Sequence, residues 1–251
     1  MTAARATFEI LPAIDLRAGR VVRLRQGDFD RETAYDTRPE VVADTFAGAG
    51  AAWLHVVDLD GARTGIPAHI GEIAGIVAAV GERARVEVAG GLRDERSVDE
   101  ALAAGAARAV IGTQALRDPA FADRLVQVHG AHRIAVAIDV RNSRAVGHGW
   151  TTDDRGIDAA EAIRRLAETG GETFEVTAIE RDGLLEGPDL DLYDRLVRLN
   201  RGSIIASGGI ATLDDLRAVR AIGCSAAIVG RALYEGQLDL NEVMALAREP
   251  G

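Results

Sequence analysis

The sequence predicts an α/β protein of the (β/α)8 TIM-barrel class, built from two duplicated half-barrels. The first reason is an internal repeat, because Ala13-Ile14-Asp15-Leu16-Arg17 returns as Ala137-Ile138-Asp139-Val140-Arg141. The second is that apolar runs alternate with helical patterns along the chain, as in strand–helix units around a parallel sheet. The third is the length of 251 residues, which suits one such barrel. We therefore expect a single domain over residues 1–251, with half-barrel repeats over about 1–130 and 131–251.

Eight strands are expected, each an apolar run bounded by turn residues. Their ranges are 8–14, 53–59, 85–89, 108–112, 133–139, 173–178, 203–207 and 225–229. Each strand is followed by a stretch with helical periodicity. The expected helices cover 39–50, 67–80, 95–104, 118–129, 158–169, 189–199, 212–222 and 238–248.

Residues that favour helix ends support several of these boundaries. The segment Ser97–Glu100 matches a capping box, and Thr212 opens another helix with a capping hydroxyl. In Asp118-Pro119 the proline suits the first helical position. Two glycines that can end helices follow expected C-termini, namely Gly105 and Gly223.

Two connections are much longer than the others. They cover residues 15–38 after the first strand and 140–157 after the fifth, which are equivalent positions of the repeat. Long loops in compact domains often form lids or binding loops. Both follow the carboxyl end of a strand, which is the active face of this architecture.

The composition limits the class of partner. Hydrophobic residues make up 47% of the chain and aromatic residues only 4%, which suits parallel strands buried on both faces. A net charge of −10 argues against nucleic-acid binding, but backbone N–H groups can still hold a small phosphorylated ligand. The single Cys224 cannot form an internal disulfide, and no apolar run suits a membrane span or a secretion signal. We expect a cytoplasmic monomer that does not bind membranes.

Gly-rich segments follow four of the expected strands and repeat between the two halves. Glycine lets backbone N–H groups approach an anion, and a following helix adds its positive end. The plainer alternative is that these glycines only form tight turns, but the matched set favours two phosphate sites on opposite sides of the barrel. The expected phosphate-binding residues are Gly90, Gly91, Gly112 and Thr113 in the first half, and Ser207, Gly208, Gly209, Gly230 and Arg231 in the second.

Three carboxylates stand at or just past expected strand ends: Asp15, Asp139 and Asp182. An aspartate that ends an apolar strand points into the mouth of the barrel, where desolvation is costly unless the group binds something. Such surroundings can raise the pKa of a carboxyl enough for general acid or base work. Asp58 is instead expected to cap a helix or to pair with an arginine, and Asp182 also suits a simple turn.

Two further residues are candidates for ligand contact. Trp150 lies in a Gly-rich polar segment, where it could stack on a planar heterocycle or anchor the loop on the barrel rim. His55 lies within an expected strand. Its side chain either faces the mouth of the barrel, as a ligand contact would, or only fills that space. No spacing of histidine or cysteine resembles a zinc site, so no metal is expected.

Motifs along essentially the whole chain point to one family. They are Ile14-Asp15-Leu16, Gly19–Leu24, Gln26-Gly27-Asp28, Leu54–Ala62, Gly90–Arg93, Val110–Thr113, Gly149-Trp150, Thr177–Gly183, Ser207–Ile210 and Ile228–Leu233. With these motifs the chain resembles the ProFAR isomerase family of histidine biosynthesis. The resemblance implies a half-barrel-duplicated (β/α)8 fold and an Amadori rearrangement of a bisphosphorylated aminoaldose into its aminoketose. It also implies that the reaction needs no cofactor and no metal.

The resemblance also implies roles for individual side chains. Asp15 would accept the proton, and the donor would be Asp139 or Asp182. We favour Asp182 as the acid, with Asp139 and Thr177 orienting the substrate. The implied substrate-binding residues are Arg23, His55 and Trp150.

Three alternatives compete with this function. The cyclase that follows in the same pathway has lysine in place of Arg23 and lacks the Gly-Trp motif. A bifunctional isomerase, which also acts on phosphoribosyl anthranilate in tryptophan biosynthesis, carries arginine and serine where this chain has His148 and Ala89. These departures favour the single-substrate enzyme. A non-catalytic phospho-ligand sensor would keep the glycine loops but has no reason to keep Asp15 and Asp182 together.

Overall fold

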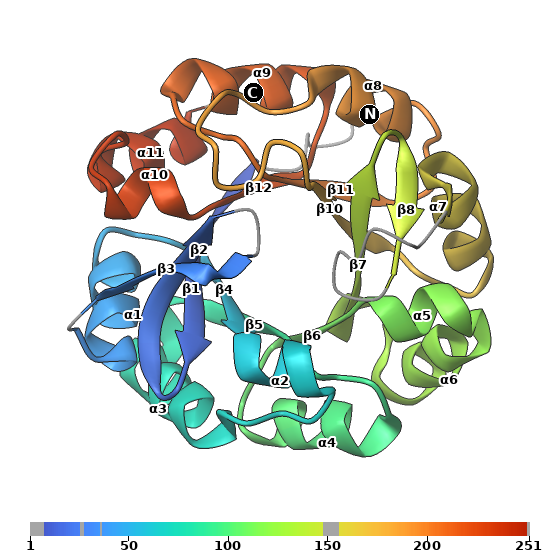
Figure 1. Cartoon of the computed structure of the whole chain (residues 1–251), viewed down its shortest axis with the longest axis horizontal. Coiled ribbons are helices and arrows are strands. Elements are labelled where there is room, and N and C mark those ends of the chain that lie inside the picture. The colour runs from blue at the N-terminus through green and yellow to red at the C-terminus, as the bar shows by residue number, and fades with distance from the viewer. Residues whose placement is uncertain (1–7, 26–27, 36, 148–155, 250–251) are drawn as a thin grey trace, which may run out of the picture.

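Eight parallel strands close into a barrel in the computed structural model, which describes residues 8–25, 28–35, 37–147 and 156–249 (Figure 1). Each strand pairs with the next in the order β1, β4, β5, β6, β7, β10, β11, β12, and β12 pairs with β1. The strands are β1 (Glu9–Arg17), β4 (Trp53–Asp58), β5 (Arg85–Ala89), β6 (Arg108–Ile111), β7 (Ile134–Arg141), β10 (Thr173–Ala178), β11 (Ser203–Ser207) and β12 (Ala226–Val229). The prediction of a (β/α)8 barrel is confirmed.

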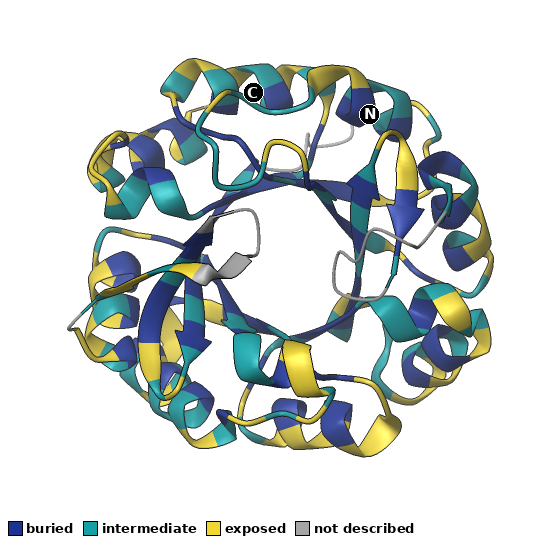
Figure 2. Cartoon of the chain, in the orientation of Figure 1, coloured by how far each residue is buried: buried dark blue, intermediate teal, exposed yellow. Residues whose placement is uncertain are grey.

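Helices surround the barrel and lie between successive strands (Figure 1). The longer ones are α1 (Pro39–Gly48), α3 (Ile70–Val80), α4 (Glu95–Ala103), α6 (Pro119–His129), α7 (Ala159–Glu168), α8 (Leu190–Val197), α9 (Leu213–Ile222) and α11 (Leu240–Arg248). Their buried residues face the sheet and their exposed residues face outward (Figure 2). In α7, for example, Ala159, Ile163 and Leu166 are buried at helical spacing.

Strand β4 shows how side chains divide between the two faces of the sheet. Successive residues of a strand point to opposite faces. Leu54 and Val56 therefore pack outward into the main core under the helices. Trp53 belongs to a smaller apolar cluster with Leu11, Ala13, Ile205, Ala226 and Ile228. His55 and Val57 line a cavity.

The two long connections contain antiparallel strands, so the expectation of plain loops was wrong. After β1, strand β2 (Arg20–Arg25) pairs with β1, and β3 (Asp28–Tyr35) pairs with β2. After β7, strand β8 (Arg144–Val146) pairs with β7, and β9 (Ile157–Asp158) pairs with β8. Both hairpins turn through two residues with positive φ, at Ala18 and Gly19 (48° and 73°) and at Asn142 and Ser143 (49° and 62°). Two consecutive positive φ values produce a turn whose twist matches the flanking strands.

The hairpins change the position of two candidate carboxylates. Because β1 continues to Arg17 and β7 to Arg141, Asp15 and Asp139 lie within strands rather than at their ends. Asp15 pairs with Val22 of β2 on one side and Val57 of β4 on the other. Asp139 likewise pairs with Val146 of β8 and Thr177 of β10, so neighbouring strands fix the backbone of both residues. The equivalent hairpins agree with a duplication, but the division at about residue 130 remains a prediction.

The helix caps follow the sequence except at one position. The Thr212–Asp215 capping box and Pro119 at the start of α6 are confirmed. The capping box that was expected to begin at Ser97 instead begins at Asp94, whose side chain accepts from the Ser97 N–H at 2.8 Å. Ser97 therefore occupies the third position of the helix rather than its cap.

Among the described residues, three short α-helices were not expected. They are α2 (Leu59–Thr64), α5 (Thr113–Arg117) and α10 (Arg231–Tyr234), and each begins directly after a barrel strand or one residue beyond it. None of the helices in the described part of the chain has the length and apolarity needed to cross a bilayer.

Candidate active site

A cavity of about 590 Å³ opens at the carboxyl ends of the barrel strands. Every candidate residue that the structure describes lines it, and Trp150 lies outside the described residues. The candidates that line the cavity are Asp15, Arg23, His55, Gly90, Gly91, Gly112, Thr113, Asp139, Thr177, Asp182, Ser207, Gly208, Gly209, Gly230 and Arg231. Residues from both halves of the chain therefore share one site.

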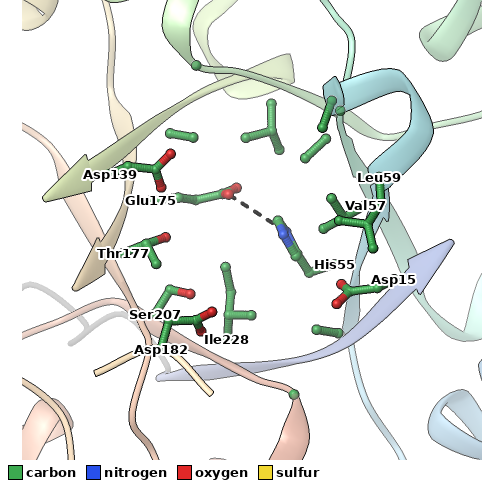
Figure 3. Close-up of a pocket in the computed structure, with 18 of the residues that line it drawn as sticks. Asp15, His55, Val57, Leu59, Asp139, Glu175, Thr177, Asp182, Ser207 and Ile228 are labelled. Carbon is green, nitrogen blue, oxygen red and sulfur yellow. Dashed lines mark ion pairs between the residues drawn. The ribbon is translucent and has the colours of Figure 1, made fainter. Parts of the chain in front are cut away.

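Asp15 enters this cavity from β1, near His55 (Figure 3). Its Oδ2 lies 2.9 Å from Nη1 of Arg23, and both side chains are largely buried. Burial raises the pKa of Asp15, while the nearby charges of Arg23 and His55 lower it. The net rise makes this carboxylate a better proton acceptor than an exposed aspartate.

Asp182 faces the same cavity from the loop after β10, near Ser207 in the view of Figure 3. Its backbone N–H donates to the carbonyl oxygen of Ala178 at 3.0 Å. Burial raises the pKa of Asp182 to about 6, the charge of Arg23 opposes this rise, and Asp15 adds to it. A carboxyl with such a pKa can hold a proton near neutral pH, as a general acid must.

The paired glycines allow neighbouring loops to approach one another closely. Gly90 has a φ of +103°, and a Cβ there would lie 2.1 Å from the carbonyl oxygen of Asp58. Gly209 has a φ of +82°, and a Cβ there would lie 2.3 Å from the carbonyl oxygen of Gly187. The close packing of the loops alone therefore requires glycine at both positions. This structural role is compatible with anion binding, because it leaves the backbone exposed to the cavity.

The uncapped starts of two short helices flank the cavity. Gly112 is the N-cap residue of α5 and Gly230 that of α10, and neither receives a side-chain cap among the described residues. Unsatisfied N–H groups at a helix start favour an anion. At the second start Arg23 is very close, because a Cβ on Gly230 would lie 1.7 Å from Nη2 of Arg23.

Asp58 and Asp60 have structural roles. Asp58 is fully buried and accepts from the N–H groups of Gly61 (2.7 Å) and His69 (3.0 Å), so the expectation that it caps a helix is confirmed. Asp60-Gly61 in the first half returns as Asp182-Gly183 in the second, and Asp60 accepts from the N–H of Ala18 at 2.7 Å. The equivalent positions have thus diverged, because Asp60 anchors a hairpin turn while Asp182 faces the cavity.

Sequence reasoning missed two acidic residues inside the barrel. Nδ1 of His55 lies 2.7 Å from Glu87 and 3.7 Å from Glu175. The ligand atoms of these three residues lie within 4.8 Å of one another, a spacing that can hold a metal. However, Arg108 donates to the second carboxylate oxygen of Glu87 at 2.8 Å, which places a cation beside any metal bound there. The cluster is therefore better described as a network of ion pairs and hydrogen bonds.

Comparisons with known proteins agree with this architecture. The pattern of the histidine biosynthesis protein family matches residues 9–239. A relative from Roseiflexus sp. (strain RS-1) is 46% identical over 238 residues, which cover 95% of this chain and 99% of the relative. A relative from Geobacillus thermodenitrificans (strain NG80-2) is 41% identical over 247 residues, covering 97% and 99%. A third, from Bifidobacterium animalis subsp. lactis (strain AD011), is 40% identical over 244 residues, covering 96% and 99%.

All three relatives carry the same name, 1-(5-phosphoribosyl)-5-((5-phosphoribosylamino)methylideneamino) imidazole-4-carboxamide isomerase. The family pattern and the relatives each cover nearly the whole chain. This chain belongs to the histidine biosynthesis protein family.

Proposed function

We propose that this protein is an aldose–ketose isomerase that acts on the bisphosphorylated aminoaldose named in its relatives. The observation that carries the proposal is the placement of Asp15 and Asp182 in one cavity that is also lined by both sets of glycines. A bisphosphorylated molecule could be held at both ends with its sugar between the two carboxyls. We also propose that the chain is a cytoplasmic monomer and a single domain of two half-barrels.

The reaction needs one acid and one base. A protonated carboxyl donates to the ring oxygen of the ribose, so that the ring opens to a protonated imine. A carboxylate then removes the proton from C2, and the electron pair of that bond forms the enolamine. Loss of the hydroxyl proton at C2 and protonation of C1 give the ketose. Two carboxyls in different protonation states are sufficient for these proton transfers.

We assign the base to Asp15 and the acid to Asp182, with Asp139 as the alternative donor. Asp15 is paired with the guanidinium of Arg23, which favours its ionised form. Asp182 has a pKa of about 6 and can therefore hold a proton near neutral pH. Thr177 and Asp139 would orient the sugar, and Trp150 would stack on the imidazole.

The phosphates would occupy the two ends of the cavity. In the first half, Gly90, Gly91, Gly112 and Thr113 would bind one phosphate, and in the second half Ser207, Gly208, Gly209, Gly230 and Arg231 would bind the other. The uncapped starts of α5 and α10 support this assignment. Arg23 lies beside the second start and would contact the substrate there.

A paired assay with the purified protein tests the proposed function. We expect conversion of the histidine-pathway aminoaldose to its ketose, and no conversion of phosphoribosyl anthranilate. Conversion of both substrates would favour the bifunctional isomerase. Conversion of neither would contradict the assignment of an isomerase.

Replacing Asp182 by asparagine should lower activity and raise stability at alkaline pH. Because the pKa of Asp182 is about 6 in the folded protein, against an ordinary 3.8, stability falls as the pH rises between these values and stays lower above them. Asp182→Asn should therefore gain ~1 kcal/mol at about pH 8 and nothing near pH 3, while kcat falls on the order of 100-fold. Urea denaturation at both pH values and steady-state kinetics measure these effects. A stability gain that is equal at both pH values would contradict a raised pKa of Asp182 as its cause.

A further inference from the structure

Four ionisable side chains form one cluster inside the barrel. They come from four different strands and consist of His55 on β4, Glu87 on β5, Arg108 on β6 and Glu175 on β10. Glu87 is 0% exposed and Glu175 is 3% exposed. Burying a charge is costly unless it is paired and hydrogen-bonded. The contacts that each of these groups makes therefore indicate its charge and its role.

Glu87 links His55 to Arg108. Its Oε1 lies 2.7 Å from Nδ1 of His55, and its Oε2 accepts from Nε of Arg108 at 2.8 Å. The register of the sheet sets these contacts, because Glu87 pairs with His55 on one side and with Arg108 on the other. Glu87 is thus held between two cationic partners, which stabilise its ionised form, and its pKa is lowered despite burial.

Glu175 differs from Glu87 although both are buried glutamates near His55. It lies 3.7 Å from Nδ1 of His55 (dashed line in Figure 3), and its Oε1 has no hydrogen-bond partner among the described residues. Burial raises the pKa of Glu175, and the neighbouring charge of Glu87 raises it further. Glu175 is therefore the carboxyl of this pair that holds a proton more readily, and Glu87 is the one that stays ionised to lower pH.

The imidazole of His55 faces charged groups on several elements. They are Glu87 from β5, Arg108 from β6 through Glu87, Glu175 from β10, and Asp15 from β1 on the cavity side. Burial lowers the pKa of His55, but the charge of Glu175, the hydrogen bond and charge of Glu87, and the charge of Asp15 outweigh this and raise it to about 9. Nε2 of His55 has no hydrogen-bond partner among the described residues, while the side chain lines the cavity.

We propose that Glu87 is a positioning residue, whose hydrogen bond to Nδ1 fixes both the orientation and the charged form of His55 beside Asp15. A carboxylate on one ring nitrogen determines which way the other nitrogen points and how basic the ring is. The charged ring favours the ionised form of Asp15, which the proton abstraction requires. It also leaves the Nε2–H for an oxygen of the substrate. This inference deepens the proposed function and depends on it for the role of Asp15.

Two variants of the same size separate this role from a structural one. Glu87→Gln removes the ionised partner of His55, and kcat should fall on the order of 10- to 100-fold, as when a carboxylate that orients a functional histidine is lost. Glu175→Gln places the same neutral amide on the glutamate that holds its proton more readily and lies 3.7 Å from Nδ1 of His55, and kcat should stay within about threefold of wild type. An unchanged kcat in Glu87→Gln, or an equal loss in both variants, would overturn the proposal.

The pH dependence gives a readout that a loss of packing would not produce. Without Glu87, the pKa of His55 should fall toward the ordinary histidine value, so that the ring loses its proton between about pH 6 and pH 8. The ratio of kcat in Glu87→Gln to kcat in wild type should therefore decrease as the pH rises through this range. A ratio that is constant with pH would contradict the charge that we assign to His55.

A measurement on the unmodified protein remains decisive even if Glu87→Gln does not fold. Nitrogen-15 NMR of the histidine rings in the substrate-free wild type reports their charge, and His55→Gln identifies the signal of His55. We expect a charged ring at about pH 7.5, and a neutral ring there would overturn the proposal. This result does not depend on turnover, so it is distinguishable from a failure of the proposed function in the paired assay.

Discussion

Replacing Asp15 by asparagine is expected to remove nearly all turnover of the aminoaldose while leaving its binding largely intact. The amide has almost the same size as the carboxyl and keeps the β1 backbone paired with β2 and β4. It cannot accept the C2 proton, so kcat should fall on the order of 1000-fold, within the usual range for loss of a general base. Steady-state kinetics measure the loss, and calorimetric titration with the ketose product measures binding.

A matched control for this substitution is Asp214→Asn. Asp214 lies on α9 outside the cavity and pairs with Arg217 on the surface, so its loss should leave kcat unchanged. If Asp15→Asn kept more than a tenth of the wild-type kcat, Asp15 would not be the base. If the wild type bound the product but never turned over substrate, the chain would be a sensor rather than an enzyme.

Of the substitutions proposed here, Gly90→Ala should cause the largest decrease in the free energy of unfolding. A Cβ at this position would lie 2.1 Å from the carbonyl oxygen of Asp58, and the φ of +103° is one that side chains rarely adopt. The added Cβ and the carbonyl oxygen of Asp58 are both held in place by the backbone. The loop after β5 must therefore move away from the end of β4 to relieve the clash. We expect a loss on the order of 3 kcal/mol in the free energy of unfolding, measured by urea denaturation.

Gly71→Ala is the corresponding control. Gly71 lies in α3, and a Cβ there would meet nothing within 4 Å. Alanine favours a helix over glycine, so this variant should be more stable by up to ~1 kcal/mol. Opposite signs for the two glycines would support the packing role of Gly90. A Gly90→Ala protein as stable as wild type would contradict it.

The barrel frame was predictable from sequence because each strand is a short apolar run with clear boundaries. The predicted ranges 173–178 and 203–207 coincide with β10 and β11. The hairpins were missed, since Ala18-Gly19 and Asn142-Ser143 are not the Asn-Gly type of pair that marks such a turn strongly. Their effect on Asp15 and Asp139 follows from pairing with neighbouring strands, which single-sequence patterns do not contain.

Residues of the candidate site were predictable where a pattern within a single segment of the sequence marks them. Glycine pairs and aspartates after apolar runs fit this description, and all the predicted site residues of these two kinds line the cavity. The His55–Glu87–Glu175 network does not, because the register of separate strands brings its members together. A signal was nevertheless present, since Glu87 stands alone between Val86 and Val88 in a buried strand.

A crystal structure with the bisphosphorylated ketose bound is the most direct test of how the site works. We expect one phosphate against Gly90, Gly91 and Gly112, and the other against Gly208, Gly209 and Gly230. The reacting sugar carbons should lie between Asp15 and Asp182, within hydrogen-bond reach of both carboxyls. A ligand anchored by only one phosphate, or with its sugar away from either carboxyl, would contradict the acid and base assignments proposed for this barrel.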